Sequence, residues 1–371
     1  MTHYTELEDL ESDLVEMARG MTVPTIPNPA PAVLARVDAA ERKRPALWPV
    51  RRRLVLIITL ALSLTAGVAA AYALLYPIPE GFDISITSPN PDGTGDVFII
   101  TSDDLEQLTS GPGFNGGATW SPDCSRIAFH SNRDGNPTPD FDIYMMNPDG
   151  TGVVKIVDTP GVDMLASWSP DGTRLVFSHD GTALHLVNAD GSGLTRLANA
   201  PAGGVADWSP DGRRILFSWD GGQEGTSEVY VINLDGTDLR NLTSDGAIAP
   251  HATWSPDGTR IAFASNREQL EEFGPANRFY WPAGGLDIYV MNADGSDVTR
   301  LTDHPENDML PRWSPDGQRI SFTSARISGL GGAFNRGPNR WDVYVMKADG
   351  SELAHVIQGT GHGWSSCKTQ R

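Results

Sequence analysis

Charged and imidazole side chains stand at short, fixed distances before tryptophans that recur along this chain. Asp163 and Asp308 lie five residues before their tryptophans, His251 lies three before and His362 two before. Carboxylates and imidazoles bind cations or polar ligands when several of them point into one pocket. If these four converge at one channel mouth, we expect a polar-ligand or cation site there. The alternative is that they are ordinary solvated residues lining the channel.

Two more charged residues, Asp207 and Arg312, immediately precede their tryptophans and belong to the same candidate site. Four acidic or imidazole side chains on separate repeats are too few to predict a metal, so we expect no metal and no cofactor. The sequence has no Gly-x-Ser-x-Gly, no His-Glu-x-x-His and no glycine-rich phosphate loop. It therefore favours binding over catalysis and predicts that the protein is not an enzyme. A hydrolase with its active site at the channel mouth is the alternative.

The tryptophans belong to a unit that repeats through residues 81–371. Its first motif, Trp-Ser-Pro-Asp-Gly, starts at Trp168, Trp208, Trp254 and Trp313, with a fifth copy at Trp120 that ends in Cys124. A basic residue and an apolar run follow each copy, and an Asn-x-Asp-Gly type of turn comes later. Proline and glycine at these places suit tight hairpin turns, so each unit predicts four antiparallel strands. The aspartate of each Ser-Pro-Asp and the arginine three residues later are expected to pair across the hairpin.

Repeated four-stranded units are typical of a β-propeller. The first unit begins at its second strand, residues 82–86, and its missing first strand is supplied by residues 361–366 around Trp364. We therefore predict an all-β, six-bladed propeller closed by the C-terminal strand, with the tryptophans filling the wedges between blades. Ring closure leaves no open sheet edge.

A second segment, residues 54–76, has 23 residues and no charge. A helix rises about 1.5 Å per residue and a hydrocarbon core is about 30 Å thick, so this stretch predicts one transmembrane helix. Basic clusters precede it at 42–44 and 51–53, which places the N-terminus in the cytoplasm and residues 77–371 outside the membrane. The expected localisation is the cell membrane, with a single span and an extracytoplasmic propeller.

The cytoplasmic tail, residues 1–53, divides into an acidic amphipathic helix at 4–19 and a proline-rich, then basic, linker. The helix could dock on a cytoplasmic partner or could be merely solvated. Acidic and basic residues cancel in this tail, so the net charge of −19 belongs to the C-terminal portion. Such a charge excludes nucleic acid as a partner, because the chain would repel a polyanion.

The chain has two cysteines, Cys124 and Cys367. Cys124 takes the glycine position of the second blade's turn, and Cys367 takes the aspartate position in the blade shared by both chain ends. We hypothesise a disulfide between them that locks the closing strand, since disulfides persist outside the cytoplasm. The alternative is a pair of free, partly buried thiols.

Two long loops, residues 266–286 and 325–341, come from neighbouring units and combine aromatic with basic side chains. Long loops are often functional, and partner-binding surfaces are enriched in aromatic residues and arginine. The alternative is that the aromatic side chains pack down over the blade edges. The residues that we select as partner-binding candidates are Phe279, Tyr280, Trp281, Arg336, Arg340 and Trp341.

The string WSPDGxRIxF, followed by DIYVMNADGSxxxRLT, resembles the repeat of TolB-type propellers through residues 81–371. This resemblance implies a six-bladed propeller. TolB-type proteins of this family are soluble periplasmic binding partners with an α/β domain before the propeller. This chain resembles them in the propeller but has a predicted membrane span in place of that domain. The first 76 residues are similar to the tails of single-pass anti-sigma factors. We therefore predict a membrane-anchored propeller that binds or senses an extracytoplasmic protein or polar ligand. The alternative is a transmembrane regulator of the anti-sigma type that signals through residues 1–50.

Overall fold

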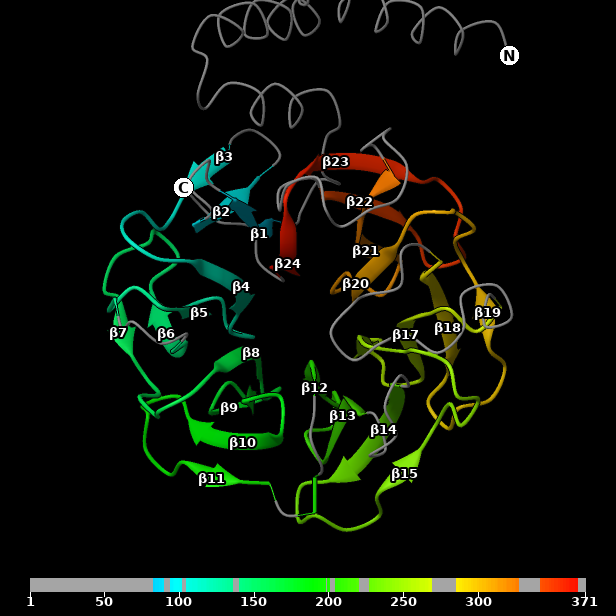
Figure 1. The fold of residues 1–371 in the computed structure, drawn as a ribbon, viewed down its shortest axis with the longest axis horizontal. Coiled ribbons are helices and arrows are strands. Elements are labelled where there is room, and N and C mark those ends of the chain that lie inside the picture. The colour runs from blue at the N-terminus through cyan, green and yellow to red at the C-terminus, as the bar shows by residue number, and fades with distance from the viewer. Residues whose placement is uncertain are drawn as a thin grey trace, which may run out of the picture. The chain divides into compact units, whose positions relative to one another are not determined.

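The computed structural model describes residues 83–89, 94–101, 105–135, 140–197, 199–200, 204–219, 227–268, 285–326 and 341–365. These residues form six antiparallel sheets of four strands each, arranged as blades around a central channel (Figure 1). The prediction of an all-β, six-bladed propeller is confirmed. Residues 1–82, which include the predicted tail and membrane span, lie outside the described residues.

The first blade is built from both ends of the propeller. Its innermost strand, β24 (Thr360–Trp364), pairs antiparallel with β1 (Ile84–Pro89), which is followed by β2 (Gly95–Ile100) and β3 (Leu105–Gln107). Trp364 lies opposite Ile84 in this pairing. The closing strand is therefore the one that the sequence predicts, starting one residue earlier.

The other blades each use four consecutive strands, with the innermost first. The second blade is β4 (Asn115–Trp120), β5 (Ile127–Ser131), β6 (Asp142–Met146) and β7 (Val154–Lys155). The third is β8 (Asp163–Trp168), β9 (Arg174–His179), β10 (Ala183–Asn188) and β11 (Thr195–Arg196). The fourth is β12 (Ala206–Trp208), β13 (Arg214–Trp219), β14 (Glu228–Asn233) and β15 (Arg240–Asn241). The fifth is β16 (Ala252–Trp254), β17 (Arg260–Ser265), β18 (Asp287–Asn292) and β19 (Thr299–Arg300). The sixth is β20 (Asp308–Trp313), β21 (Arg319–Ser324), β22 (Asp342–Lys347) and β23 (Ala354–Gln358).

Antiparallel order gives the propeller two different faces. The hairpins that join the first to the second strand and the third to the fourth strand of each blade lie on one face, which we call the turn face. The connections from second to third strand, and from each blade to the next, lie on the opposite face, which we call the loop face. The two long loops of the fifth and sixth blades therefore leave their strands on the loop face.

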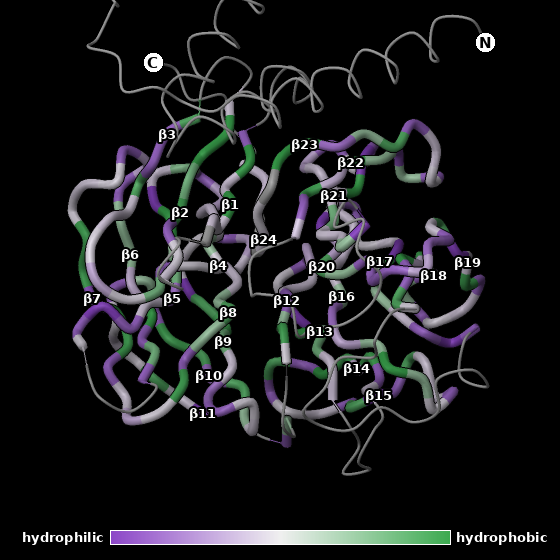
Figure 2. Tube along the Cα trace, turned by 45° about the horizontal axis from the view of Figure 1, so that its top comes forward, coloured by the Kyte–Doolittle hydropathy of each residue, from purple (hydrophilic) through white to green (hydrophobic). Residues whose placement is uncertain are grey.

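The hydrophobic core lies between neighbouring blades. Six of the clusters of buried apolar residues each contain one of the repeated tryptophans: Trp120, Trp168, Trp208, Trp254, Trp313 and Trp364. Each cluster combines side chains from two adjacent blades, and hydrophobic residues recur along the strands of every blade in Figure 2. The predicted role of tryptophan as the wedge between blades is confirmed. Burial of this kind stabilises the ring as a whole, because no blade covers its own two sheet faces.

The repeated turns are held by hydrogen bonds from their own side chains. In the third blade, Asp171 accepts a hydrogen bond from the Ser169 hydroxyl at 2.6 Å and another from the Thr173 backbone N–H at 3.0 Å. These bonds to the charged form, the serine bond foremost, lower the pKa of Asp171 to about 2. Gly172 has φ +68°, as this turn requires. The aspartates of these turns are structural, as the sequence predicts.

The arginine that follows these turns has, in three blades, a partner that the sequence did not predict. An ion pair across the hairpin is present at Asp211 and Arg214, with 3.8 Å between the charged atoms. The Arg214 guanidinium also lies 5.0 Å from the ring centre of Trp254 in the next blade. Arg174 and Arg260 stack in the same way on the tryptophan of the following blade, at 5.0 and 4.6 Å. In these three blades the arginine therefore joins neighbouring blades by a cation–π contact, and in the fourth blade it also pairs with the aspartate of its own turn.

Candidate functional site

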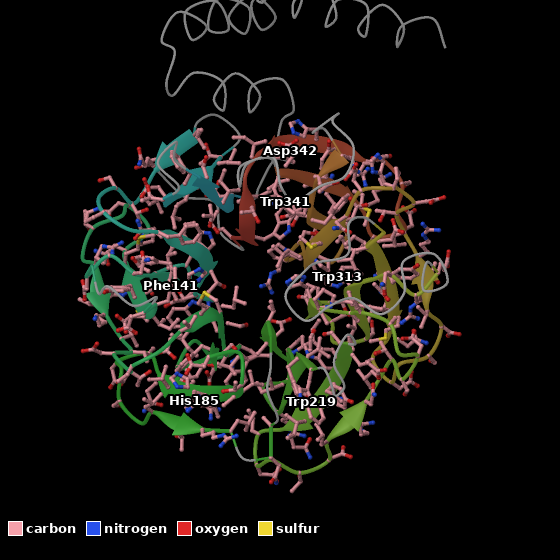
Figure 3. The ribbon with its side chains drawn as sticks, viewed as in Figure 1. Phe141, His185, Trp219, Trp313, Trp341 and Asp342 are labelled. Atoms are coloured by element: carbon pink, nitrogen blue, oxygen red, sulfur yellow. The ribbon has the colours of Figure 1, made fainter. Side chains whose placement is uncertain are left out.

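A cavity of about 410 Å³ lies in the central channel and receives residues from all six blades. Its walls come from the innermost strands β24, β4, β8, β12, β16 and β20 and from their turns. Trp313, which lines this cavity, is placed toward the centre of the ring in Figure 3, whereas His185 and Trp219 lie further out on their blades. A volume of this size is within the range of small-ligand pockets.

The residue immediately before each tryptophan forms a second repeated position in the cavity wall. Side chains alternate along a strand, so a tryptophan directed between blades turns its predecessor toward the channel. Described members of this position from every blade line the cavity: Thr119, Ser167, Asp207, Thr253, Arg312 and Gly363. The tryptophan is the same in all six blades, whereas the residue before it has five different identities.

Asp207 joins three blades through its carboxylate. One oxygen accepts a hydrogen bond from the Ser167 hydroxyl of the third blade at 3.1 Å. The other accepts from the Thr253 hydroxyl and from the Trp254 backbone N–H of the fifth blade, both at 2.9 Å. Three donors therefore surround this charge, and they hold the carboxylate in one orientation.

Arg312 lies on the same repeated position in the sixth blade and is half-buried. Its backbone carbonyl accepts hydrogen bonds from Ser321 and from the Trp364 indole. Within the described part of the chain, its guanidinium makes no hydrogen bond and no ion pair. Burial, and to a smaller extent the positive charge of Arg312, lower the pKa of the neighbouring His251 to about 3. His251 is therefore neutral at physiological pH, and Arg312 supplies positive charge to the cavity.

Asp163 and Asp308, the first residues of β8 and β20, do not line this cavity. The start of each innermost strand lies opposite the end of the second strand, and Asp163 pairs there with His179. Its carboxylate lies 2.7 Å from His179 Nδ1, and the carboxylate of Asp308 lies 2.5 Å from Arg326 Nη2. Both aspartates are fully buried, and burial raises the pKa of Asp308 while Arg326 opposes that change. Each carboxylate is thus paired within its own blade.

Comparison with known proteins agrees with this architecture. Residues 196–270 match the family described as the TolB beta propeller domain. Over this range the chain is similar to TolB propellers. Its structure is similar to TolB from Acinetobacter baumannii, with a TM-score of 0.57 and 22% identity, over 76% of this chain and 66% of that one. It is also similar to a putative TolB from Agrobacterium tumefaciens, with a TM-score of 0.55 and 22% identity, over 76% and 90% of the two chains.

These similarities concern the fold of the TolB-type propeller. The chain spans 66% of the length of the Acinetobacter baumannii protein. An oligogalacturonate lyase in complex with manganese matches with a TM-score of 0.46 and 15% identity, over 75% of this chain and 74% of that one, a level at which we infer no function. In the described ranges, no group of three or more His, Cys, Asp or Glu side chains is placed to hold a metal ion.

The TolB-type propeller thus brings together two of the six predicted channel residues, Asp207 and Arg312. The side chain of His251 is buried and is not part of the cavity lining. His362 belongs to β24, but its side chain is outside what the structure describes. The convergence predicted for Asp163, Asp308, His251 and His362 is therefore replaced by a cavity whose charged lining residues are one carboxylate and one guanidinium.

The loops predicted to bind a partner lie mostly outside the described residues, which exclude Phe279, Tyr280, Trp281, Arg336 and Arg340. The exception is Trp341, at the start of the sixth blade's third strand. Its partly buried ring packs against a small cluster formed by Ile248, Leu286 and Met309. Trp341 therefore packs down over the loop-face ends of the fifth and sixth blades, and the role of the other five residues stays a prediction.

A repeated arginine was missed by the sequence reasoning. Arg133, Arg267 and Arg326 each stand thirteen residues after a tryptophan, at the end of a Ser-x-Arg triplet. Each guanidinium lies over a phenylalanine and a tyrosine of its own blade, at 4.9 to 5.3 Å from the ring centres. The repeated Ser-x-Arg spacing was the signal that could have identified it.

Two strained leucines were also not foreseen. The innermost strands β4, β8 and β20 change register near their middle, and the residues there, Gly117, Leu165 and Leu310, have φ of 60°, 60° and 54°. Leucine rarely adopts a positive φ. Both leucines line the cavity. Backbone strain of this kind often accompanies binding sites, because the surrounding structure must hold it in place.

Cys124 takes the glycine position of its turn with φ +59°, close to the values of the glycines in the other blades. It is disulfide-bonded, and its sulfur lies 3.9 Å from the hydroxyl of Ser365 at the end of the closing strand. Cys367, two residues further on, lies outside the described residues. Its pairing with Cys124 stays a prediction, supported by this proximity and by the presence of only two cysteines.

The predicted membrane span is not tested by the propeller. Among the described residues, no helix is long and apolar enough to cross a membrane. Residues 54–76 lie outside them, as does the amphipathic segment 4–19.

Proposed function

We propose that this protein is a binding module: a TolB-type propeller, anchored by one N-terminal span, that binds an extracytoplasmic partner protein at its loop face and channel. The observation that carries this proposal is the contrast along each innermost strand. The tryptophan needed for packing recurs in every blade, whereas the preceding residue that borders the cavity varies from Gly to Asp to Arg. A fold that required only a closed ring would not need this variety, whereas recognition of a particular partner does.

The arrangement of the two faces supports the same proposal. The turn face repeats the same aspartate-glycine hairpins in nearly every blade, so it offers little that distinguishes one blade from another. The loop face carries the two long loops and the blade-to-blade connections. Binding sites concentrate on loops that a rigid scaffold positions. The loop face is therefore where we place the partner.

Membrane anchoring in this proposal rests on the uncharged stretch at 54–76 and its basic N-terminal flank. Protease treatment of cells whose cell membrane is intact tests it directly. The protease should cleave the propeller once the outer barrier of the cell is opened, while an epitope placed before residue 54 should stay uncleaved. Protection of the propeller together with digestion of the N-terminal epitope would contradict this orientation.

Site-specific crosslinking in native envelopes tests partner binding. Pro305 is exposed on the loop face between β19 and β20, and Pro256 is exposed in the β16–β17 hairpin on the turn face. A photoreactive amino acid at 305 should form a discrete adduct with one protein, and the same group at 256 should not. Excess unlabelled chain should compete the adduct away. No adduct from either position would overturn the proposal.

Two other functions have their own outcomes. If deletion of residues 1–20 changes transcription while the propeller stays folded, the chain is a transmembrane regulator of the anti-sigma type. If the purified chain turns over a substrate and Asp207→Asn, which keeps the hydrogen bond from the Trp254 N–H, abolishes that turnover, the channel is a hydrolase site. Neither effect is expected from a binding module.

A further inference from the structure

The cavity in the channel contains an imbalance between hydrogen-bond donors and acceptors. Its described charged lining residues are Asp207 and Arg312. The carboxylate of Asp207 already receives three hydrogen bonds, from Ser167, Thr253 and the Trp254 backbone. A guanidinium carries five N–H donors, and that of Arg312 has no acceptor in the part of the chain that the structure describes. The cavity thus offers free donors and positive charge at one place.

The surroundings of Arg312 strengthen the attraction between its positive charge and a bound anion. Leu165, Leu310 and four tryptophans form apolar parts of the same wall. Apolar walls lower the local dielectric constant, so an ion pair inside the cavity is stronger than the same pair in water. His251, which lies close enough for Arg312 to lower its pKa, is neutral and adds no second positive charge. The cavity therefore suits one negative charge.

We propose that the channel binds a carboxylate group through the guanidinium of Arg312. This inference rests on the proposed function, since it names the chemistry that the channel recognises. A carboxylate matches the planar guanidinium with two parallel hydrogen bonds. The group comes either from a free organic acid or from an acidic residue of the bound partner.

A carboxylate fits this cavity better than a phosphate. One guanidinium neutralises one negative charge, which a carboxylate supplies. A phosphate dianion would bring a second negative charge next to Asp207, in a chain whose net charge is already −19. Like charges in a poorly solvated cavity repel strongly.

Tryptophan fluorescence of the full-length chain in detergent tests the proposal, because Trp208, Trp254, Trp313 and Trp364 line the cavity. The probes are acetate, the peptide acetyl-Gly-Glu-Gly-amide and its Gln counterpart, inorganic phosphate, and sodium chloride at matched ionic strength. Acetate or the Glu peptide, each with one negative charge, should give a saturable change at millimolar concentration or below. The Gln peptide and sodium chloride should give none.

Arg312→Gln should weaken carboxylate binding at least about tenfold, the effect of losing one charge-assisted hydrogen-bonded pair. The matched control is Arg213→Gln, which removes the same charge from an exposed turn outside the cavity lining. The guanidinium of Arg312 has no protein partner among the described residues, so Arg312→Gln should keep the thermal midpoint of the wild type. Arg312→Lys, which keeps the charge but loses the planar fork, should bind with intermediate affinity.

The outcomes separate the sources of the carboxylate. Binding of acetate alone identifies a free acid, and binding of the Glu peptide identifies an acidic side chain of a partner; both support the proposal. Failure of both probes, unchanged affinity in Arg312→Gln, or tighter binding of phosphate would overturn it. If the crosslinked adduct at position 305 forms while carboxylates do not bind, only this inference fails. If carboxylates bind but no adduct forms, the proposed partner binding fails instead.

Discussion

Replacement of Asp207 by alanine tests whether this side chain holds the third, fourth and fifth blades together. The change removes the acceptor of three hydrogen bonds, of 3.1, 2.9 and 2.9 Å. One of the donors is the backbone N–H of Trp254, a residue that is only 4% exposed. A buried donor left without an acceptor costs about 1–3 kcal/mol. The hydroxyl groups of Ser167 and Thr253 border the cavity, where water can replace the carboxylate.

The expected loss of unfolding free energy is therefore about 2–4 kcal/mol, most of it from the Trp254 N–H and the rest from the two bonds to a charged acceptor. Domains of 150–250 residues lose about 2–4 °C of melting temperature per kcal/mol, so Asp207→Ala should melt roughly 4–16 °C below the wild type. Asp207→Asn is the matched control. Its amide oxygen still accepts from the Trp254 N–H, so it should lose about 1 kcal/mol or less.

Thermal unfolding of the full-length chain, followed by tryptophan fluorescence at several heating rates, measures this difference. Heating rates matter because large domains can unfold irreversibly. If Asp207→Ala melts within 1–2 °C of the wild type, or if the asparagine variant loses as much as the alanine variant, then the three bonds do not join the blades as described.

Three further changes probe the blades and the seam of the ring. Arg326→Gln leaves the buried carboxylate of Asp308 without its cation and should cost about 3–5 kcal/mol at neutral pH. Burial already raises the pKa of Asp308, and loss of the arginine raises that pKa more. The stability lost in Arg326→Gln should therefore shrink as the pH falls to about 4 and the Asp308 carboxyl becomes protonated. An equal loss of stability at neutral pH and at pH about 4 would refute this. Gly295→Ala should destabilise the protein more than Gly258→Ala in urea unfolding. The Cβ added at position 295 would lie 2.7 Å from a backbone oxygen of the preceding blade, whereas the Cβ added at position 258 would lie 3.7 Å from its nearest atom. Cys124→Ser should lose about 2–4 kcal/mol of unfolding free energy and melt at a lower temperature, and reductant should no longer change its melting temperature. Two titratable thiols in the unreduced, denatured wild type would contradict the disulfide.

The propeller could be predicted because its signals are local and repeated. A Ser-Pro-Asp-Gly turn fixes a hairpin through its own proline, aspartate and glycine, without help from distant residues. The alternation of side chains along a strand then directs Trp168 and its equivalents to one side. Trp364 at the far end of the chain carries the same signal, and it located the closing strand before any pairing was known.

Two of the six predicted channel residues line the cavity, because a repeat position does not reveal which neighbour a side chain meets. Asp163 and Asp308 are the first residues of their strands, and each pairs with a basic side chain, His179 or Arg326, at or just beyond the end of the adjacent strand. Asp207 and Arg312 lie next to a tryptophan whose direction is fixed, so their own direction toward the channel follows. The turn motifs do not predict the bulges at Leu165 and Leu310, because leucine has no local preference for a positive φ and packing must impose it.

The turn arginines show the same limit. Within one hairpin, Asp211 and Arg214 are suitable partners, and they do approach each other. The same guanidinium also lies across the blade boundary, on the face of Trp254. Contacts between repeats depend on the curvature of the ring, which a single repeat does not encode.

The most direct test of the account is the comparison of crosslinked adducts from positions 305 and 256 in one preparation of native envelopes, with the captured protein identified by mass spectrometry. A propeller that binds its partner at the loop face should yield the same protein repeatedly from position 305 and none above background from position 256. Equal adducts from both faces, or an adduct from position 256 alone, would contradict it.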